Sequence, residues 1–409
     1  MRLVTTLKLL VTYTAEVVFY DNIDNTQSRG STVSVQYPAV DPEGLLEFSV
    51  VFTDRALNHM SAAFQGVMRD ISSVMREVYN ADAVAIVPGG GTYGMEAVAR
   101  QFASGATCLV IRNGWFSYRW SQILEAGSIP EDTIVMNARP VDHSDQPAYA
   151  PPAIDDVVRT IRDEQPAVVF APHVETASGM LLPDDYLAQI GEAVHEYGGL
   201  FVLDCVASGA LWVDMKACHV DVLISAPQKG WSSSPCSAIV MFSELGSEKL
   251  AQTKSTSFAN DLGKWRQIMQ AYEAGGHAYH ATMPTDALAK FRDNMLETQG
   301  TGFAHLKAAQ VELGRRVRAL FAEFGFKSVS ASDYAAPGVV VSYTGDPEFR
   351  SGAWFRARGL QTAAGVPLMI GESADFSTFR VGLFGLEKWN DIDGTVANLE
   401  RALSDLPER

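Results

Sequence analysis

The chain has 409 residues, of which 47% are hydrophobic and 20% are charged, and its formal net charge is −16. This composition is typical of a globular protein with one large domain and a smaller one, and it does not fit a disordered chain. Because acidic residues outnumber basic ones and no basic cluster stands out, we expect no nucleic acid and no membrane surface as a partner. A small anionic ligand is still compatible with this charge if positive groups gather in one cleft.

The N-terminal stretch from Leu3 to Tyr20 is apolar only in parts, because Lys8, Glu16 and several threonines interrupt it. No apolar run in the chain reaches the ~18–20 residues of a membrane-spanning helix. No clear cleavage site supports the alternative, a secretory signal segment. The four cysteines lie far apart without a C-x-x-C pair, which favours buried thiols in a reducing compartment over a zinc site. We therefore expect a cytoplasmic protein without a bound metal.

The next part of the chain alternates between helical and strand patterns. After a polar stretch at 21–36, which we expect to be loop, apolar residues at helical spacing predict a helix over 60–78. Short apolar runs then alternate with helical segments; they lie at 83–87, 107–111, 133–136, 168–171, 200–204, 222–225 and 237–242. Continuous apolar runs of this kind predict an α/β fold whose mostly parallel, seven-stranded sheet carries helices on both faces.

From about residue 290 the pattern changes to that of a smaller α+β domain. Leu306, Leu313, Val317 and Leu320 predict a long helix. We expect it to be followed by strands near 327–330, 338–343 and 378–381, and by a last helix near 390–405. The predicted organisation is therefore an N-terminal segment that is partly loop, a large ligand-binding domain and a small C-terminal domain, over residues 1–55, 56–289 and 290–409.

Two costly charges lie where predicted strands end. Asp204 closes the run Leu-Phe-Val-Leu-Asp, and Lys229 follows 25 residues later within Ser-Ala-Pro-Gln-Lys-Gly. The carboxyl ends of parallel strands open on one crevice, and both charges are expensive there unless a ligand uses them. Pyridoxal 5′-phosphate would do so, since a carboxylate keeps its pyridine nitrogen protonated and a lysine amine bonds its aldehyde as a Schiff base. The alternative is an Asp that caps a turn and a solvated Lys.

Two further motifs follow predicted strands. Three glycines at 89–91 precede a predicted helix, where backbone N–H groups can approach a phosphate and the helix N-terminus favours its charge. The stretch lacks the G-K-[ST] of a Walker loop, and a plain glycine turn is the alternative. Asn-Gly-Trp-Phe at 113–116 could place an aromatic ring against a pyridine ring, although ordinary packing explains it equally well.

Three more motifs occur along the chain: HVETASG at 173–179, GGHAYHATMP at 275–284 and FRVGLFG at 379–385. In chain order, the whole set of motifs resembles class V aminotransferases of fold type I, nearest the alanine–glyoxylate and serine–glyoxylate branch, over about residues 55–405. The resemblance implies pyridoxal 5′-phosphate as cofactor. It also implies transfer of an amino group between a small amino acid, such as alanine or serine, and a 2-oxo acid, such as glyoxylate or pyruvate.

The resemblance also implies roles for residues around the cofactor. Lys229 matches the Schiff-base lysine and Asp204 the partner of the pyridine nitrogen. The remaining cofactor-binding matches are Gly90, Gly91 and Thr92 as phosphate loop, Gln228 beside the phosphate, Phe116 stacked on the ring, Val206 on its opposite face and Thr176 near its hydroxyl.

Three more matches concern the partner subunit and the substrate. Tyr279 and Thr282 match a pair that reaches the phosphate of the neighbouring subunit, which implies a homodimer with shared active sites. Arg380 matches the arginine that binds the substrate carboxylate, for which the planar guanidinium fork is suited. The family's Gly-Pro-Gly-Pro stretch is missing here, where residues 36–61 read QYPAVDPEGLLEFSVVFTDRALNHMS. Because that stretch shapes the substrate pocket, this departure leaves the substrate open.

Two alternatives share the fold. A cysteine desulfurase or related lyase uses the same cofactor, but that branch carries histidines where this chain has Phe116 and Gln228. It also needs a cysteine in the C-terminal part, and no cysteine follows Cys236. A relative without catalytic activity is expected to lack Lys229 or Asp204, and both are present.

Overall fold

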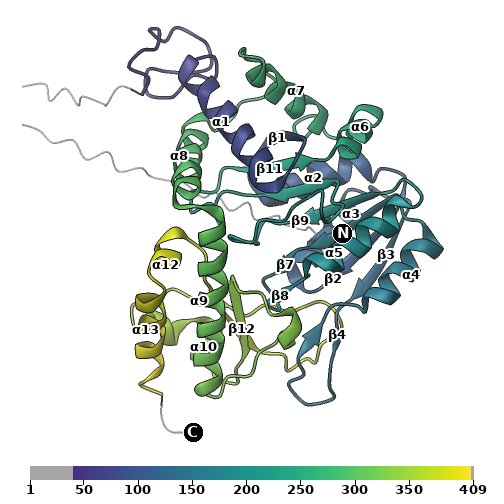
Figure 1. Ribbon diagram of the computed structural model, residues 1–409, viewed down its shortest axis with the longest axis vertical. Helices are drawn as coiled ribbons and strands as arrows, with labels where there is room; N and C mark the ends of the chain where they lie inside the picture. The colour runs from purple at the N-terminus through teal and green to yellow at the C-terminus, as the bar shows by residue number, and fades with distance from the viewer. Residues whose placement is uncertain (1–39, 407–409) are drawn as a thin grey trace, which may run out of the picture. The chain divides into compact units, whose positions relative to one another are not determined.

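The computed structural model describes residues 40–406, shown in Figure 1. The predictions for the stretch from Leu3 to Tyr20 and for the polar loop at 21–36 lie outside the described residues.

The centre of the fold is a seven-stranded sheet in the order β1-β11-β10-β9-β6-β2-β3. Its strands are β1 (Ala83–Pro88), β2 (Thr107–Arg112), β3 (Asp132–Asn137), β6 (Val168–Pro172), β9 (Leu200–Asp204), β10 (Val222–Ser225) and β11 (Ser237–Phe242). All seven strands predicted for this sheet are therefore confirmed. Strand β11 runs antiparallel to both of its neighbours, and the other pairs are parallel. The mostly parallel sheet places the carboxyl ends of β6, β9 and β10 at one edge.

Helices cover this sheet and join its strands. They are α1 (Ala62–Tyr79), α2 (Gly91–Phe102), α3 (Trp115–Ala126), α4 (Ile154–Glu164), α5 (Asp184–His195), α6 (Glu244–Gln252), α7 (Leu262–Glu273) and α8 (Thr285–Thr301). Helix α1 begins where the side chain of Ser61 accepts a hydrogen bond from Phe64 N, and it ends at Asn80 in the left-handed conformation. Helices α1 and α7 pack against β1, α2 against β10 and β11, α3 against β2 and β6, and α5 against β9. The short pairs β4–β5 (Arg139–Pro140, Tyr149–Ala150) and β7–β8 (Val174–Glu175, Met180–Leu181) lie outside the main sheet.

The C-terminal part is built around the long helix α9 (Phe303–Glu323), with α12 (Leu386–Asn390) and α13 (Ile392–Leu403) beside it in Figure 1. The remaining elements are β12 (Val339–Tyr343), α10 (Pro347–Ser351), α11 (Ala353–Arg356), β13 (Ala363–Ala364) and β14 (Thr378–Gly382). Strands β12, β14 and β13 form an antiparallel sheet in that order. The strand predicted at 327–330 is wrong, because Ser328 and Ser330 form only isolated bridges, to Ser342 on one side and to Tyr149 on the other.

Buried apolar side chains form three clusters in the described chain. One fills the main sheet and its helices and includes Met295 of α8. A second surrounds α9, and the third joins residues of both parts, such as Val174 and Met180 with Val339 and Val341. The two predicted domains therefore share apolar contacts, and their boundaries stay a prediction.

The four cysteines are free and buried, as their apolar surroundings predict. Within residues 40–406, no helix combines the length and the apolar character that crossing a bilayer requires.

Candidate active site

A cavity of about 370 Å³ opens at the carboxyl ends of β9 and β10. It lies between the start of α2, the start of α3 and strand β14 of the C-terminal part. Most of the predicted site residues line it, namely Gly91, Thr92, Phe116, Thr176, Asp204, Val206, Gln228, Lys229 and Arg380. The parallel sheet thus brings together residues that lie almost 300 positions apart in the chain.

Asp204 is the last residue of β9, and its carboxylate lines the cavity. Its Oδ1 accepts a hydrogen bond from Val206 N at 2.9 Å, which fixes the direction of the side chain. Part of the carboxylate is accessible through the cavity, but the surrounding protein raises its pKa to about 6, mainly through burial. The Val206 hydrogen bond and the charge of Arg119 oppose this increase, whereas the charge of Glu175 adds to it. A carboxylate in such surroundings is well suited to meet a cation.

Lys229 follows β10 and reaches the same cavity. Its Nζ lies 5.7 Å from the centre of the Phe384 ring, and no carboxylate between residues 40 and 406 forms an ion pair with it. Burial, with a smaller contribution from the charge of Arg380, lowers the pKa of this amine. A larger fraction of Lys229 is therefore neutral near pH 7 than of an exposed lysine, and only the neutral amine is a nucleophile or a base.

The glycine stretch forms the turn from β1 into α2. Gly89 has a φ of +117°, in the region that favours glycine, and Gly90 is the N-cap of α2. A Cβ on Gly91 would lie 2.6 Å from a methyl group of Val206, so this position admits no side chain. The first N–H groups of α2, which have no partner within the helix, start at the rim of the cavity.

Gln228 provides a test of whether these residues fit an anionic group. Its side-chain Oε1 is buried and has no hydrogen-bond partner within the described chain. Because the O and N atoms of such an amide are assigned from their partners, the unpaired position can equally present an N–H donor. Beside Gly91 and Thr92, this donor set suits a phosphate.

Two guanidinium groups flank the ring of Phe116. The Cζ atoms of Arg119 and Arg380 lie 5.2 Å and 5.5 Å from the ring centre. Arg119 donates a hydrogen bond to Thr92 Oγ1 at 3.0 Å, and Arg380 donates to Ala364 O at 2.8 Å. Burial lowers the pKa of Arg380, and the charge of Glu175 opposes this effect. The cavity thus holds two guanidinium groups besides the amine of Lys229, in a chain whose net charge is −16.

Glu175 is a fully buried carboxylate behind the cavity wall. It accepts hydrogen bonds from Ser117 N at 2.8 Å, Ser117 Oγ at 2.7 Å, Phe116 N at 3.3 Å and Ala177 N at 2.9 Å. A Cβ on Gly114 would lie 2.8 Å from Glu175 Cγ, so the glycine lets the carboxylate reach the start of α3. Burial raises the pKa of Glu175 and these hydrogen bonds oppose the increase. The carboxylate caps α3 and fixes the backbone that carries Phe116.

A comparison with known protein families identifies the family of the chain. The family model described as Aminotransferase class-V matches residues 47–299, more than half of the chain. The chain belongs to the class-V aminotransferase family. This transaminase depends on pyridoxal 5′-phosphate, as its motifs predicted.

Similar proteins agree with this assignment. A 2-aminoethylphosphonate–pyruvate transaminase of Paraburkholderia phymatum is 27% identical over 358 residues, which cover 86% of this chain and 89% of that protein. An alanine–glyoxylate aminotransferase of Nostoc has a similar structure, with a TM-score of 0.72 and 23% identity over 85% of this chain and 89% of that one. A ureidoglycine–glyoxylate aminotransferase of Bacillus subtilis has a TM-score of 0.70 and 21% identity, covering 85% and 87%. At these identities the two structures show the fold of the transaminase.

Three predicted residues of the transaminase lie outside the lining of the cavity. Gly90 directly precedes the lining residue Gly91. Tyr279 is 55% exposed, and its Oη lies 3.2 Å from Thr282 Oγ1. Thr282 is exposed as well.

The sequence motifs did not single out Arg119 or Glu175. Arg119 lies one helical turn after Phe116, and this spacing is the only signal that would place both on one face of α3. Glu175 stands in the motif HVETASG, but nothing in the motif indicates that its carboxylate caps another helix.

Replacing Glu175 with Ala is expected to lower the free energy of unfolding by about 3 kcal/mol or more, because three buried donors, Ser117 N, Ser117 Oγ and Ala177 N, lose their acceptor at about 1–3 kcal/mol each. Denaturant unfolding of the transaminase measures this loss. The control is Glu125→Ala on the same helix, where the side chain is exposed and the expected change is within about 0.5 kcal/mol. Equal, small losses for both variants would contradict the role of Glu175.

Proposed function

We propose that Lys229 attaches the cofactor and that the enzyme moves an amino group between a small amino acid and a 2-oxo acid such as pyruvate or glyoxylate. The convergence of an amine, a carboxylate and a guanidinium, those of Lys229, Asp204 and Arg380, on one cavity supports this proposal most directly. Free, buried cysteines support a reducing, cytoplasmic location.

The residues of the site would divide between the two ends of the cofactor. Gly90, Gly91, Thr92 and Gln228 would hold its phosphate, and Arg119, which donates a hydrogen bond to Thr92, would add positive charge there. Phe116 and Val206 would cover the two faces of the ring, Thr176 would lie near its hydroxyl, and Asp204 would pair with its nitrogen; all four of these residues line the cavity.

The bound cofactor supplies a ring that accepts electrons from the substrate carbon atom. Asp204 keeps the ring nitrogen protonated by placing a negative charge beside it. Lys229 would take the proton from the substrate Cα and return it to the cofactor carbon that receives the amino group, and its lowered pKa favours the neutral form that this task needs. Arg380 orients the substrate through its carboxylate.

Replacing Arg380 with Lys is expected to lower kcat/KM for α-amino acids roughly 30- to 1,000-fold, which corresponds to a loss of about 2–4 kcal/mol in transition-state stabilisation. A point charge cannot replace two parallel hydrogen bonds to a carboxylate. Cofactor affinity is expected to stay the same, because the phosphate and ring contacts lie elsewhere. The control is Arg316→Lys on α9, outside the cavity lining, where the guanidinium pairs with the exposed carboxylate of Asp393 on α13. Unchanged turnover by Arg380→Lys would mean that another residue holds the carboxylate, or that the donor has none.

A homodimer is supported by an exposed apolar surface near Tyr279. Leu45, Leu46, Phe48 and Val50 are between 82% and 102% exposed. Ring contacts of Phe52 with His59 at 5.4 Å, and of His59 with Tyr279 at 5.5 Å, connect this segment to the proposed partner-binding pair. An apolar surface of this kind is costly in water and favours a subunit interface.

Shared sites predict that two impaired chains complement each other. A Lys229→Ala chain paired with a Tyr279→Phe/Thr282→Ala chain forms one intact site and one doubly damaged site. At a cofactor concentration that fills intact sites but not damaged ones, this heterodimer is expected to keep about half of the activity of the unmodified dimer, since one of its two sites is complete. A homodimer of either variant is expected to be less active than the heterodimer. Sedimentation checks the assembly, and a monomer with full activity would contradict the shared site.

A second donor class is an aminoalkylphosphonate. The relative from Paraburkholderia phymatum is named for 2-aminoethylphosphonate, and Arg119 adds a second guanidinium to the cavity. The test is a panel of alanine, serine and 2-aminoethylphosphonate as donors, with pyruvate and glyoxylate as acceptors, followed through cofactor absorbance. An enzyme that transfers no amino group from any donor, and instead forms alanine from cysteine, would refute transamination and favour the desulfurase alternative.

A further inference from the structure

A second cavity of about 500 Å³ lies between α9, the start of α5 and the segments 211–213 and 335–337. It shares no lining residue with the catalytic cavity. Its walls are mostly apolar and include Leu181, Pro183, Leu211, Trp212, Val213 and Val311. None of the roles proposed for the transaminase uses this space, which is large enough for a small organic molecule.

Positive charge collects in this cavity although the chain as a whole is strongly negative. Lys307, Arg315 and Arg318 line it, together with one carboxylate, that of Asp184. Arg315 pairs with Glu312 at 2.7 Å, whereas Arg318 donates to the backbone carbonyls of Ala336 at 2.7 Å and Val339 at 2.9 Å and forms no ion pair with another described residue. Carbonyl groups satisfy its N–H donors but leave its charge without a counter-ion.

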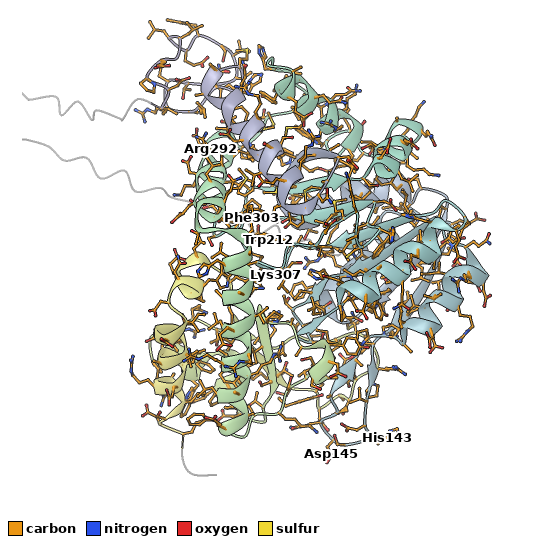
Figure 2. The ribbon with its side chains drawn as sticks, in the orientation of Figure 1. His143, Asp145, Trp212, Arg292, Phe303 and Lys307 are labelled. Atoms are coloured by element: carbon orange, nitrogen blue, oxygen red, sulfur yellow. The ribbon has the colours of Figure 1, made fainter. Side chains whose placement is uncertain are left out.

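Lys307 is the cation best placed to meet a ligand. It is exposed and forms no ion pair within residues 40–406. Figure 2 shows Lys307 on α9, near Trp212 and on the side of the helix that faces the sheet. The ring of His173 is buried in the cavity wall. Burial lowers the pKa of His173 to about 3, and the charge of Lys307 contributes to the decrease. His173 is therefore neutral near pH 7 and adds no charge of its own.

We propose that this cavity binds a small organic anion with an aromatic or branched apolar body. The acid group of the ligand lies against Lys307, and its body packs on Trp212 and Leu211. The charge complements the unpaired cations, and the apolar walls gain from losing contact with water. A carboxylate, sulfonate or phosphate ester shares this chemistry.

The cavity lies directly behind the catalytic one, so the test must separate the two. His173 lines the second cavity and its neighbour Val174 lines the catalytic one, and His173 N donates to Asp204 O at 2.9 Å. Arg380 offers a carboxylate-binding group on the catalytic side. An anion that binds the enzyme could therefore use either cation, and only variants of both distinguish them.

The probe is 2-naphthoate, titrated calorimetrically into the cofactor-loaded enzyme, with neutral 2-naphthamide as the matched ligand. We expect 2-naphthoate to bind at least about tenfold more tightly than the amide, because a charge-assisted hydrogen bond is worth that much or more. Lys307→Glu is expected to weaken naphthoate binding by about tenfold or more, and Lys307→Gln by less. Lys264→Glu, at an exposed lysine of α7, and Arg380→Lys are expected to leave it unchanged.

Three results would overturn the proposal: no binding of 2-naphthoate at millimolar concentration, equal affinity in the Lys307 variants, or loss of binding in Arg380→Lys, which would place the ligand in the catalytic cavity. Because Lys307 is exposed, both of its variants are expected to fold, and circular dichroism checks this. The titration needs no turnover, so its outcome is independent of the proposed reaction.

Discussion

Replacing Lys229 with Ala is expected to lower kcat by about 10⁴-fold or more, the largest effect of any single change in this enzyme. The variant loses both the group that attaches the cofactor and the base that moves the substrate proton. Among residues 40–406, no other lysine lines the catalytic cavity, so no described neighbour can take over either task. Single-turnover measurements of the amino-acid half-reaction, followed by cofactor absorbance, give this decrease directly.

Lys229→Arg separates the chemistry of the amine from its charge. Arginine keeps the positive charge beside Phe384, but its guanidinium cannot lose a proton near pH 7. This variant is therefore expected to be as inactive as Lys229→Ala. Borohydride reduction of the unmodified enzyme, followed by peptide mapping, should label Lys229. A label on another lysine, or an active Lys229→Arg enzyme, would show that the amine of Lys229 is not the reacting group.

The strands of the main sheet could be predicted because each is a continuous apolar run between polar or glycine-rich segments. Strand direction could not be predicted in the same way. Strand β11 reads like its parallel neighbours but runs antiparallel between β1 and β10, since a run that is buried on both faces carries no mark of its direction. The residues 327–330 failed as a strand for a different reason, because their backbone divides its bonds between β12 and Tyr149.

In the candidate site, residues could be predicted where the local sequence marks them, but contacts between separate helices and strands could not. Asp204 and Lys229 could be identified because each directly follows an apolar run, so their positions in the sequence indicate the same edge of the sheet. The contacts of Arg119 with Thr92 and of Glu175 with Ser117 join separate elements. Such contacts depend on how α2, α3 and β7 pack, which no local pattern records. The second cavity is harder still to predict, because its walls come from five separate segments.

Asp204→Asn is the second decisive test, because it keeps the shape of the side chain and removes only its charge. The amine of Lys229 is still expected to attach the cofactor. The rate of proton removal from the substrate is expected to decrease by about 10²- to 10³-fold, the usual cost of losing one prearranged electrostatic partner. The ring nitrogen then lacks the anion that keeps it protonated, and the loss acts mainly on the transition state.

The raised pKa of Asp204 adds a dependence on pH that the Asn variant lacks. Burial raises this pKa to about 6 before the cofactor binds. Above pH 6 the carboxyl group is ionised and pairs with the protonated ring nitrogen, whereas below pH 6 it becomes neutral and this attraction is lost. Cofactor affinity of the unmodified apoenzyme is therefore expected to decrease as the pH falls through 6, relative to Asp204→Asn.

The difference between the two proteins reports on the carboxyl group together with the ring nitrogen that it pairs with, because the other titrating groups are present in both. Asp333→Asn, at an exposed position, is the control and should follow the unmodified enzyme at every pH. Equal pH dependence in Asp204→Asn and the unmodified enzyme, together with a nearly normal single-turnover rate, would mean that Asp204 serves only to hold the turn at Val206 and that the ring nitrogen has a different partner.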